Sequence, residues 1–480
     1  MNFWKNHRAS GEQLFSLTEG GAVVHRDKSG KVSPYWLCAC KQERNLTVGL
    51  MDQVADPLNL QRAYRRVKAN AGKGGVDGME VKELSKWMKE NFESLRGQLL
   101  NGCYSPSPVR GVQIPKPQGG YRQLGIPTVI DRLVQQAIHQ VLSERYEKIF
   151  SENSYGFRPQ RSAHQALSQA GLYVSKGNAY VIDLDLEKFF DEVNHHRLMW
   201  LLSQRIGDSR LLQLIHRFLQ SGLLQGGLTS QRTKGTPQGG PLSPLLSNII
   251  LDELDKELER RGHHFVRYAD DVKVFVRSEA SAQRVKDRIS KYIEGRLLLK
   301  VSGKKSRICK GYELNFLGHS ILPNGQLGLS EESQARIKQK VKKITQRKRG
   351  VSLGQILMEL RRYLPGWLMY FKHALMTRQM ERMDRWIRRK LRCYRLKQCK
   401  RVIGIVRWLR QRGVEETLCW RTALSGKSWW RLSNSPGSTI GMPNRWLSEQ
   451  GYYSLYANYK ALHCKLLQQK PLYTQVRTVV

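Results

Sequence analysis

The sequence predicts an α+β protein in which an antiparallel sheet is followed by a largely helical and strongly basic part. Two segments rich in strand-forming residues, 180–193 and 263–277, carry aspartates. Between them, a glycine- and proline-rich loop leads into a segment with helical apolar spacing. After residue 331, apolar residues keep helical spacing while basic residues dominate. These observations predict one part of the chain built around a sheet and a second part built from helices.

The segment 263–277, HHFVRYADDVKVFVR, is expected to form a β-hairpin. Strand-forming residues flank a short core of Ala269, Asp270 and Asp271. Two adjacent carboxylates repel each other, and a divalent cation such as Mg²⁺, which prefers hard oxygen ligands, would hold them together. A solvated Asp-Asp turn is the alternative, and this segment alone does not decide between the two.

The segment 180–193, YVIDLDLEKFFDEV, adds acidic residues to an apolar run. Its aspartates are Asp183, Asp185 and Asp191. Carboxylates inside an apolar strand cost folding free energy unless they are paired or bind metal. Asp185, Asp270 and Asp271 together could hold two metal ions about 3.5–4 Å apart, the arrangement used for in-line attack at phosphorus. We therefore expect two Mg²⁺ ions at this site, with Mn²⁺ as an alternative.

The charge of the chain indicates nucleic acid as a partner. There are 81 Lys and Arg residues against 40 Asp and Glu, which gives a net charge of +41 over 480 residues. The length suits about three domains. Hydrophobic residues make up 40%, which excludes a disordered basic tail. A generic basic protein would explain the charge but not the carboxylates.

Cysteine usage and hydropathy point to a reducing compartment. The eight cysteines are scattered and form no C-x₂-C pairs, so no zinc site is expected. There is no signal peptide and no apolar run near 20 residues, which predicts a cytoplasmic protein without a membrane partner. Residues 1–50 suggest no function. A P-loop is not expected at 70–81, because G-x-x-x-x-G-K-[ST] is absent.

Two further segments read as substrate-contacting elements. Residues 109–127 predict two short strands joined by a Lys-Pro-Gln-Gly-Gly turn, which Lys116 and Arg122 flank, with a helix beginning near Asp131. A solvated basic hairpin is the alternative reading. In 235–251, GTPQGGPLSPLLSNIIL, the glycines permit close backbone approach to a substrate, and the proline after them suits a helix start.

The order of these motifs carries a resemblance. Asp185, then PQGGPLSPLLSN, then YADD make the chain resemble a reverse transcriptase. It is most similar to the multifunctional reverse transcriptase, or maturase, encoded within bacterial and organellar group II introns. The S-P-x-x-S-N ending favours these over diversity-generating retroelement enzymes. The resemblance is dense over residues 52–325 and implies a right-hand polymerase: fingers and palm with an antiparallel sheet, a helical thumb, and a small C-terminal appendage.

The resemblance also implies roles for individual residues. Asp185, Asp270, Asp271 and the backbone carbonyl of Leu186 would bind the two metal ions. The other implied substrate contacts are Lys116 and Arg122 on the triphosphate, Gln238 near the nucleotide, Phe190 as the steric gate against a 2′-hydroxyl, and Lys305 (or its neighbour Lys304) as the palm lysine. In the block SYGFRPQRSAHQAL (154–167), Arg158 and Arg161 would lie near template or nucleotide.

Residues 331–410 resemble the thumb, or maturase domain, of the family. They contain 24 basic and 5 acidic residues, with long helices expected over 359–375 and 384–401. Aromatic residues lie between the basic ones, which suits RNA backbone contacts and stacking. A merely solvated basic face is the alternative. The residues expected to contact phosphates are Arg388, Arg389, Lys390, Arg392 and Arg395.

The predicted organisation has four parts. Residues 1–50 are an extension of unknown role, 51–325 the fingers and palm, 326–410 the thumb or maturase domain, and 411–480 a DNA-binding region. The tryptophans and tyrosines of 411–480 could equally pack a small core. The Cys-rich HNH endonuclease domain that ends many relatives is not recognised in this sequence.

The predicted function is RNA-directed DNA polymerisation by a group II intron protein that binds its intron RNA and assists splicing and mobility. Its partners would be intron RNA, RNA template, DNA primer, DNA target and dNTPs, in a bacterial, nucleoid-associated setting. The alternatives are a free-standing reverse transcriptase domesticated for DNA repair or defence, and a splicing-only maturase. The three aspartates argue against the last. The sequence leaves the cognate RNA, the priming route and the oligomeric state open.

Overall fold

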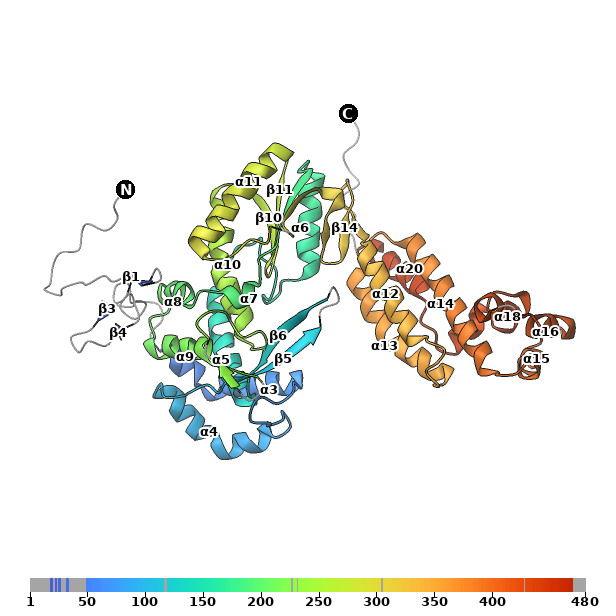
Figure 1. Cartoon of the computed structure of the whole chain (residues 1–480), viewed down its shortest axis with the longest axis horizontal. Helices are drawn as coiled ribbons and strands as arrows, with labels where there is room; N and C mark the ends of the chain where they lie inside the picture. The colour runs from blue at the N-terminus through green and yellow to red at the C-terminus, as the bar shows by residue number, and fades with distance from the viewer. Residues whose placement is uncertain are drawn as a thin grey trace. The chain divides into compact units, whose positions relative to one another are not determined.

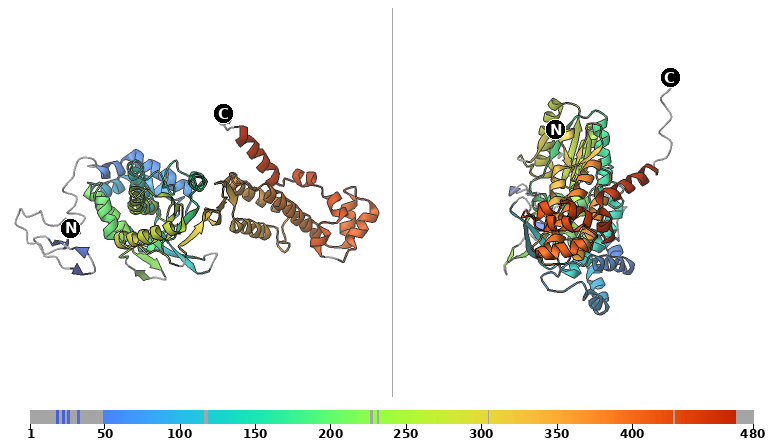
Figure 2. Two further views of the ribbon diagram at one scale, coloured as in Figure 1. Left: turned by 90° about the horizontal axis from the view of Figure 1, so that it is seen from above. Right: turned by 90° about the vertical axis from the view of Figure 1, so that its right-hand side faces the viewer.

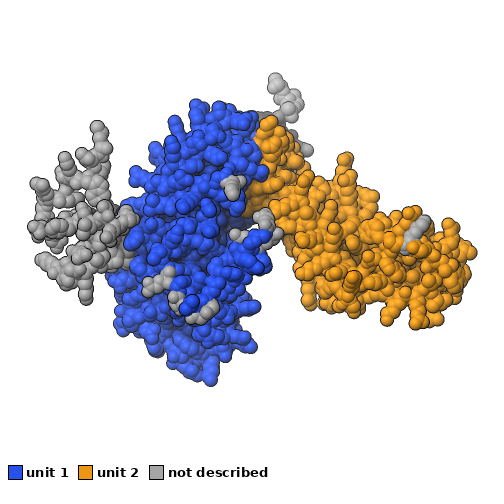
Figure 3. Space-filling view, in the orientation of Figure 1, with its two compact units in different colours: residues 1–169, 177–309 blue, residues 170–176, 310–480 orange. Residues whose placement is uncertain are grey.

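A computed structural model describes residues 49–115, 119–225, 228–230, 232–303, 305–426 and 428–468, together with four two-residue strands. These are β1 (Thr18–Glu19), β2 (Ala22–Val23), β3 (His25–Arg26) and β4 (Val32–Ser33). Contacts divide the chain into two units (Figure 3), unit 1 with residues 1–169 and 177–309, and unit 2 with residues 170–176 and 310–480. Among the described helices, none has the length and apolarity needed to cross a membrane.

The central sheet of unit 1 has the strand order β10-β11-β7-β12, and Figure 1 labels its hairpin strands β10 and β11. Its strands are β7 (Tyr180–Leu184), β10 (His264–Tyr268), β11 (Asp271–Val276) and β12 (Arg307–Lys310). Strands β10 and β11 pair antiparallel, which confirms the predicted hairpin. Its turn is tight because Ala269 adopts the left-handed conformation, with φ of 59°. The Arg267 guanidinium stabilises this turn by donating to the Ala269 carbonyl at 3.0 Å.

The two faces of the central sheet differ because side chains alternate along a strand. On one face Ile182, Leu184 and Val274 join a buried core that helices α10 (Ser243–Arg260) and α11 (Glu279–Tyr292) also supply. The opposite face receives Asp183 of β7 and Asp271 of β11. The apolar face thus anchors the sheet, and the aspartates are displayed on the other side.

A second sheet in unit 1 has the order β6-β5-β8-β9. Its strands are β5 (Val109–Pro115), β6 (Tyr121–Ile126), β8 (Leu223–Gln225) and β9 (Leu228–Ser230). The predicted hairpin of 109–127 is confirmed by the antiparallel β5–β6 pairing, whereas β5 and β8 run parallel. Lys116 belongs to the turn residues 116–118, which lie outside the described part of the chain.

Helices complete unit 1. They are α2 (Leu50–Val54), α3 (Pro57–Asn70), α4 (Leu84–Leu100), α5 (Val129–Tyr146), α6 (Ala163–Ser175, shared with unit 2), α7 (Phe189–Glu192), α8 (His195–Ser203), α9 (Ser209–Gln220) and a π-helical turn η1 (Ile293–Leu297). Helix α5 begins two residues before the expected Asp131, because the Thr128 hydroxyl accepts the Asp131 amide and caps the helix.

Unit 2 begins with a short antiparallel sheet and continues as helices, seen from two further directions in Figure 2. Its elements are η2 (Gly311–Glu313), β13 (Asn315–Phe316), β14 (His319–Ile321), β15 (Leu327–Leu329), α12 (Glu331–Ile344), α13 (Leu353–Phe371), α14 (Thr377–Gln398), α15 (Val402–Arg410), α16 (Glu416–Ala423), α17 (Trp429–Leu432), α18 (Pro436–Gly441), α19 (Asn444–Glu449) and α20 (Leu455–Gln468). The two long helices expected from the sequence correspond to α13 and α14.

One buried core runs through α12–α20 and joins the predicted thumb to the tail. The Asp384 carboxylate of α14 links the two, because it accepts the Leu455 amide at 2.9 Å and the Tyr452 hydroxyl at 2.7 Å. Trp446 and Tyr459 are also buried. For these tail aromatics, the core-packing reading of the sequence is therefore the one the structure supports.

Candidate active site

The two aspartate segments meet at the end of the central sheet. Strands β11 and β7 pair antiparallel, with Val272 opposite Leu184 and Lys273 opposite Asp183. Continuing that register by one residue places Asp271 opposite Asp185. Asp270 precedes Asp271 in the hairpin turn. Carboxylates 86 positions apart in the sequence thereby become neighbours on the polar face of the sheet.

Cations accompany these carboxylates. The Lys273 ammonium contacts both Asp183 and Asp271, and the Lys305 Nζ lies 3.2 Å from Asp185 Oδ2. The Asp271 and Asp185 side chains are 38% and 40% exposed. Both carboxylates therefore remain open to solvent on one side while lysines contact them on the other.

Burial and neighbouring charges shift the pKa values of Asp271 and Lys273. Desolvation raises the pKa of Asp271. The nearby Lys273 lowers it in part, whereas the negative charges of Asp183 and Asp270 raise it further. Burial alone would lower the pKa of Lys273, but the charges of Asp271 and Asp183 outweigh it, so the net shift is upward. Lys273 is therefore held in its charged form.

Hydrogen bonds and an ion pair hold the aspartate hairpin in place. They join β10 to helix α10 and to the segment that contains Gly156. The Asn248 amide of α10 donates to the Gly156 carbonyl at 2.9 Å, and its oxygen accepts from Arg267 at 2.8 Å. Arg267 also pairs with Asp255, and both side chains are fully buried. A Cβ atom on Gly156 would lie 2.3 Å from the Ala269 nitrogen, so only glycine permits this approach. These contacts determine where Asp270 and Asp271 lie.

The glycine-rich loop contacts the β5–β6 hairpin. The Gly125 amide donates to the Gln238 carbonyl at 3.0 Å, and Gly239 comes so close that a Cβ would lie 2.4 Å from the Gly125 oxygen. The Thr236 amide also donates to the Phe190 carbonyl at 2.7 Å. The loop thus brings Gln238 and Phe190 into one region of unit 1.

Arg122 lies on β6 and is exposed. Its positive charge acts on Asp191. Burial raises the pKa of Asp191, and the neighbouring cations Arg232, Lys188 and Arg122 partly offset this rise. The residues after β7 are also tied down. The Ser302 amide donates to the Asp185 carbonyl at 2.9 Å, and Leu186 forms a β-bridge with Val301. The segment around residues 300–306 therefore fixes the backbone that carries Asp185 and Leu186.

The donor set suits a divalent cation in chemical type. Carboxylate and carbonyl oxygens are the ligands that Mg²⁺ prefers, and the lysine ammonium groups on Asp185 and Asp271 show that both carboxylates attract positive charge. Within the described residues, however, no three His, Cys, Asp or Glu side chains are grouped closely enough to hold a metal ion. Binding would therefore require these carboxylates to move closer together than they lie here.

Comparisons with known proteins agree with this arrangement. Residues 114–321 match the model of the reverse transcriptase (RNA-dependent DNA polymerase) family, and residues 334–413 match the group II intron, maturase-specific domain. Protein YkfC of Escherichia coli is 32% identical over 314 residues, covering 57% of this chain and 82% of YkfC. The chain belongs to the group II intron reverse transcriptases. The group II intron-encoded protein LtrA of Lactococcus lactis is 30% identical, covering 54% of each chain, so this match spans about half the length of LtrA.

This reverse transcriptase is an RNA-directed DNA polymerase of the right-hand fold, in a family whose members act in intron splicing and mobility. Members of the family use divalent metals and nucleic acid substrates. Among solved structures, a Cas6-RT-Cas1–Cas2 complex is similar at 25% identity over 56% of this chain and 45% of that one, with a TM-score of 0.34. Family membership therefore rests on the sequence matches.

The structure places two predicted nucleic acid contacts in the reverse transcriptase's own packing. The Arg158 side chain is 1% exposed, pairs with Glu147 at 2.8 Å and donates to the Ser154 carbonyl. These contacts give Arg158 a structural role, and its predicted place near template or nucleotide stays a prediction. Arg161 pairs with Glu152 and remains 23% exposed.

All five basic residues predicted on α14 contact other groups of unit 2, and Lys390 does so over the Trp430 ring at 5.2 Å from its centroid. Arg388 pairs with Asp384, Arg389 donates to the Trp430 carbonyl, Arg392 is buried and donates to the Met442 carbonyl at 2.9 Å, and Arg395 lies 4.7 Å from the Trp408 ring centroid. Arg392 in particular is a packing residue, because burial leaves its guanidinium little access to a phosphate. The fifth, Lys390, lines a surface pocket.

Several residues of the site were not predicted as such. Lys273, Asn248, Arg267 and Gly156 all act on the aspartate hairpin through tertiary contacts. The available signal was a charged residue inside a strand pattern, at Lys273 and Arg267, and a glycine directly after the tyrosine of the SYGFRP block. Their partners are distant in sequence, so the pattern alone could not name them.

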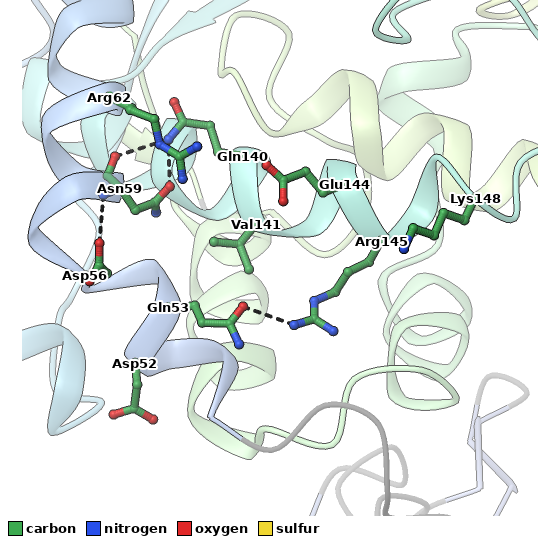
Figure 4. Close-up of a pocket in the computed structure, with 10 residues that line it drawn as sticks. All are labelled: Asp52, Gln53, Asp56, Asn59, Arg62, Gln140, Val141, Glu144, Arg145 and Lys148. Carbon is green, nitrogen blue, oxygen red and sulfur yellow. Dashed lines mark hydrogen bonds between the residues drawn. The ribbon is translucent and has the colours of Figure 1, made fainter.

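A pocket of about 740 Å³ lies elsewhere in unit 1, between α2, α3 and α5 (Figure 4). Asn59 spans it by donating to the carbonyls of Val54 and Ala137, both at 3.1 Å, and Arg145 donates to Gln53. Its lining mixes acidic and basic side chains, and none of the predicted site residues contributes to it. We assign it no part in catalysis.

Proposed function

We propose that Asp185, Asp270 and Asp271 are the catalytic carboxylates of this reverse transcriptase, and that they hold two Mg²⁺ ions, or Mn²⁺ in their place, with the Leu186 carbonyl. The observation that carries the proposal is the register that sets Asp271 opposite Asp185 on the polar face of the sheet. When bound, the ions would lower the pKa of the primer 3′-hydroxyl and neutralise charge on the triphosphate.

Basic residues near the carboxylates would bind the triphosphate of the nucleotide. The Lys305 side chain is 69% exposed, so it can exchange Asp185 for a triphosphate oxygen without disturbing the core. Arg122, on the exposed part of β6, would bind the same triphosphate, and Lys116 across the turn would assist it. Guanidinium and ammonium groups suit this task because phosphate contacts are strengthened by charge. These residues bind and orient the nucleotide.

The loop and α7 would shape the nucleotide pocket. Phe190 is half-buried, and its ring packs at 5.3 Å from that of Phe189, which keeps it in place. A fixed ring beside the sugar excludes a 2′-hydroxyl by its bulk. Gln238 lies where the loop meets the β5–β6 hairpin, in reach of a nucleotide between the two. Selection of deoxyribonucleotides would follow from these two residues.

We propose that unit 2 binds RNA through a basic pocket that shares only Lys390 with the five basic residues expected on α14 to contact phosphates. This pocket of about 420 Å³ is lined by Lys342, Lys343, Thr345, Gln346, Arg347 and Lys390. Burial together with the charges of Arg347 and Lys342 lowers the pKa of Lys390. An anion would relieve this crowding of like charges, and RNA phosphates are the anions that a maturase meets.

The wider proposal keeps the domain limits and partners expected from the sequence. Residues 51–325 would be fingers and palm, 326–410 the thumb or maturase domain, and 411–480 the DNA-binding region. Intron RNA, template, primer, DNA target and dNTPs would be the partners, and a bacterial cytoplasmic, nucleoid-associated location follows from DNA as substrate. In support, the match to the maturase-specific domain covers residues 334–413.

The carboxylate assignment is tested by Asp270→Asn combined with Asp271→Asn. Polymerisation needs charged metal ligands, whereas splicing assistance needs a surface that binds the intron. We expect cDNA synthesis on an RNA template to fall by orders of magnitude, while RNA binding and assistance of the cognate intron persist. Primer extension and intron splicing are measured on the same preparation at near-physiological Mg²⁺.

A matched control is Asp287→Asn, a similar change on the exposed side of α11, where Asp287 accepts a hydrogen bond from Gln283. This variant should keep both activities. Retained cDNA synthesis in the double variant would overturn the catalytic assignment. Loss of both activities in a folded double variant would show that polymerisation and splicing do not use separable surfaces.

The RNA pocket is tested by the salt dependence of binding. Each of Lys342→Ala, Lys343→Ala and Arg347→Ala should lower the slope of log affinity against log salt concentration by about 0.7–0.9. Arg445→Ala is the control, because Arg445 is 91% exposed and pairs only locally with Glu449. Equal slopes for the pocket variants and the control would remove the pocket from the RNA interface.

A further inference from the structure

A buried lysine contacts the catalytic hairpin. Lys273 follows Asp271 by two residues on β11, so both side chains point to the same face of the sheet. Its side chain is 4% exposed, and its ammonium group contacts one oxygen of Asp183 and one oxygen of Asp271. Apart from Lys273, all residues of β11 after Asp271 are apolar and buried.

Placing an ammonium group there costs folding free energy unless its partners compensate. Asp183 sits directly opposite Lys273 across the strands and would suffice as a partner by itself. Asp183 also has a second cation, because Arg307 Nε lies 3.6 Å from its other oxygen. The contact with Asp271 is therefore more than stability requires, and it bears on the site.

The three cations near the carboxylates differ in mobility. Lys305 and Arg307 are 69% and 55% exposed and can leave when other charges arrive. Lys273 is buried and cannot withdraw from Asp271 without moving the strand. It is a permanent positive charge in contact with a carboxylate that must also face the metal.

We propose that Lys273 is a positioning residue for Asp271, holding one carboxylate oxygen so that the other faces the metal, and that its charge weakens divalent-ion binding in the absence of nucleotide. The proposal rests on the proposed role of Asp271. Asp183 anchors Lys273 from the opposite strand. A dNTP, with its own negative charge, would offset the ammonium group, so full metal occupancy would coincide with substrate binding.

The test separates positioning from simple charge pairing. Lys273→Met removes the ammonium group and leaves the largely buried Asp183 with only the more distant Arg307 as a cation, so this variant should lose stability. The double variant Asp183→Asn with Lys273→Met keeps the net charge of the group and removes the unpaired carboxylate, so its melting temperature should return close to the wild-type value. Only a positioning role predicts that the double variant stays functionally altered.

The decisive readout is Mn²⁺ binding to the metal-free protein without nucleic acid, followed by electron paramagnetic resonance. We expect Lys273→Met, under conditions where it is folded, to bind Mn²⁺ about tenfold more tightly than wild type, because it removes a nearby positive charge and keeps both carboxylates. The kcat of the single and the double variant in primer extension should fall about tenfold or more, because nothing then holds the Asp271 carboxylate in position. Tighter metal binding combined with slower turnover is the signature.

Lys291→Met is the control, since Lys291 is exposed at the end of α11 and the change removes the same charge. It should leave Mn²⁺ affinity and kcat as in wild type. Wild-type Mn²⁺ affinity in folded Lys273→Met together with wild-type kcat in the double variant would overturn the proposal, because Lys273 would then serve stability alone. If Asp271→Asn itself left Mn²⁺ binding unchanged, the carboxylate assignment would fail instead.

Discussion

Arg267 and Asp255 form an ion pair in which neither side chain is exposed to solvent. Arg267 Nε donates to Asp255 Oδ1 at 2.8 Å, and the rest of the guanidinium reaches Asn248 and the Ala269 carbonyl. One buried charge therefore connects α10 to the turn that carries Asp270. A polar network of this kind is costly to disrupt and specific in geometry.

Breaking this pair should destabilise unit 1. Asp255→Asn leaves the Arg267 charge uncompensated in the interior, and we expect the free energy of unfolding to fall by about 3–5 kcal/mol. Chemical denaturation followed by circular dichroism measures this change. Replacing both residues by apolar ones, Arg267→Met with Asp255→Leu, should recover part of the stability. A stability loss below about 1 kcal/mol for Asp255→Asn would contradict the account.

Gly156→Ala should damage activity more than stability. The added Cβ would lie 2.3 Å from the Ala269 nitrogen, and this backbone can yield only by moving the hairpin. We expect kcat for primer extension to fall by about a hundredfold, as small displacements of catalytic groups do. Gly97→Ala in α4 is the control and should leave kcat unchanged, because a Cβ there would meet no described atom within 4 Å apart from the helix's own nearby backbone. Equal kcat values for the two variants would disprove the close approach.

Phe190→Ala should relax sugar selection. The smaller side chain leaves room for a ribose 2′-hydroxyl, so the ratio of ribonucleotide to deoxyribonucleotide incorporation should rise, by about tenfold or more, while some DNA synthesis remains. Phe190→Tyr keeps the ring and should keep discrimination. Single-nucleotide primer extension with paired dNTP and rNTP gives the ratio. An unchanged ratio in the alanine variant would place the gate at another residue.

His216 on α9 should contribute to the pH dependence of stability. Burial, with smaller effects of His195 and His196, lowers its pKa from 6.5 to about 4. Between these pH values the unfolded chain binds the proton more readily than the folded one, so the free energy of unfolding rises with pH. The contribution of His216 is fully present above about pH 6.5. His216→Gln should flatten the curve between about pH 4 and 6.5. An unchanged slope in denaturation experiments across that range would refute the assignment.

Much of the candidate site follows from local sequence, because the aspartate hairpin and the glycine-rich loop depend on short-range chemistry. Alternating strand formers around Ala269, Asp270 and Asp271 predict the hairpin, and the structure has it. The β5–β6 hairpin and helices α10, α13 and α14 follow from periodicity in the same way. These features can be predicted because residues near one another in sequence determine them.

The tertiary structure alone decided which charged side chains are exposed to a substrate and which are paired within the fold. Arg158 and Arg392 look like nucleic acid contacts in the sequence, yet both are buried and donate to backbone carbonyls. The sequence assigned no role to Lys273, yet pairing of β11 with β7 buries it between two aspartates. Whether a charged side chain serves the substrate or the fold depends on desolvation and on partners distant in sequence, and only the packed chain brings those together.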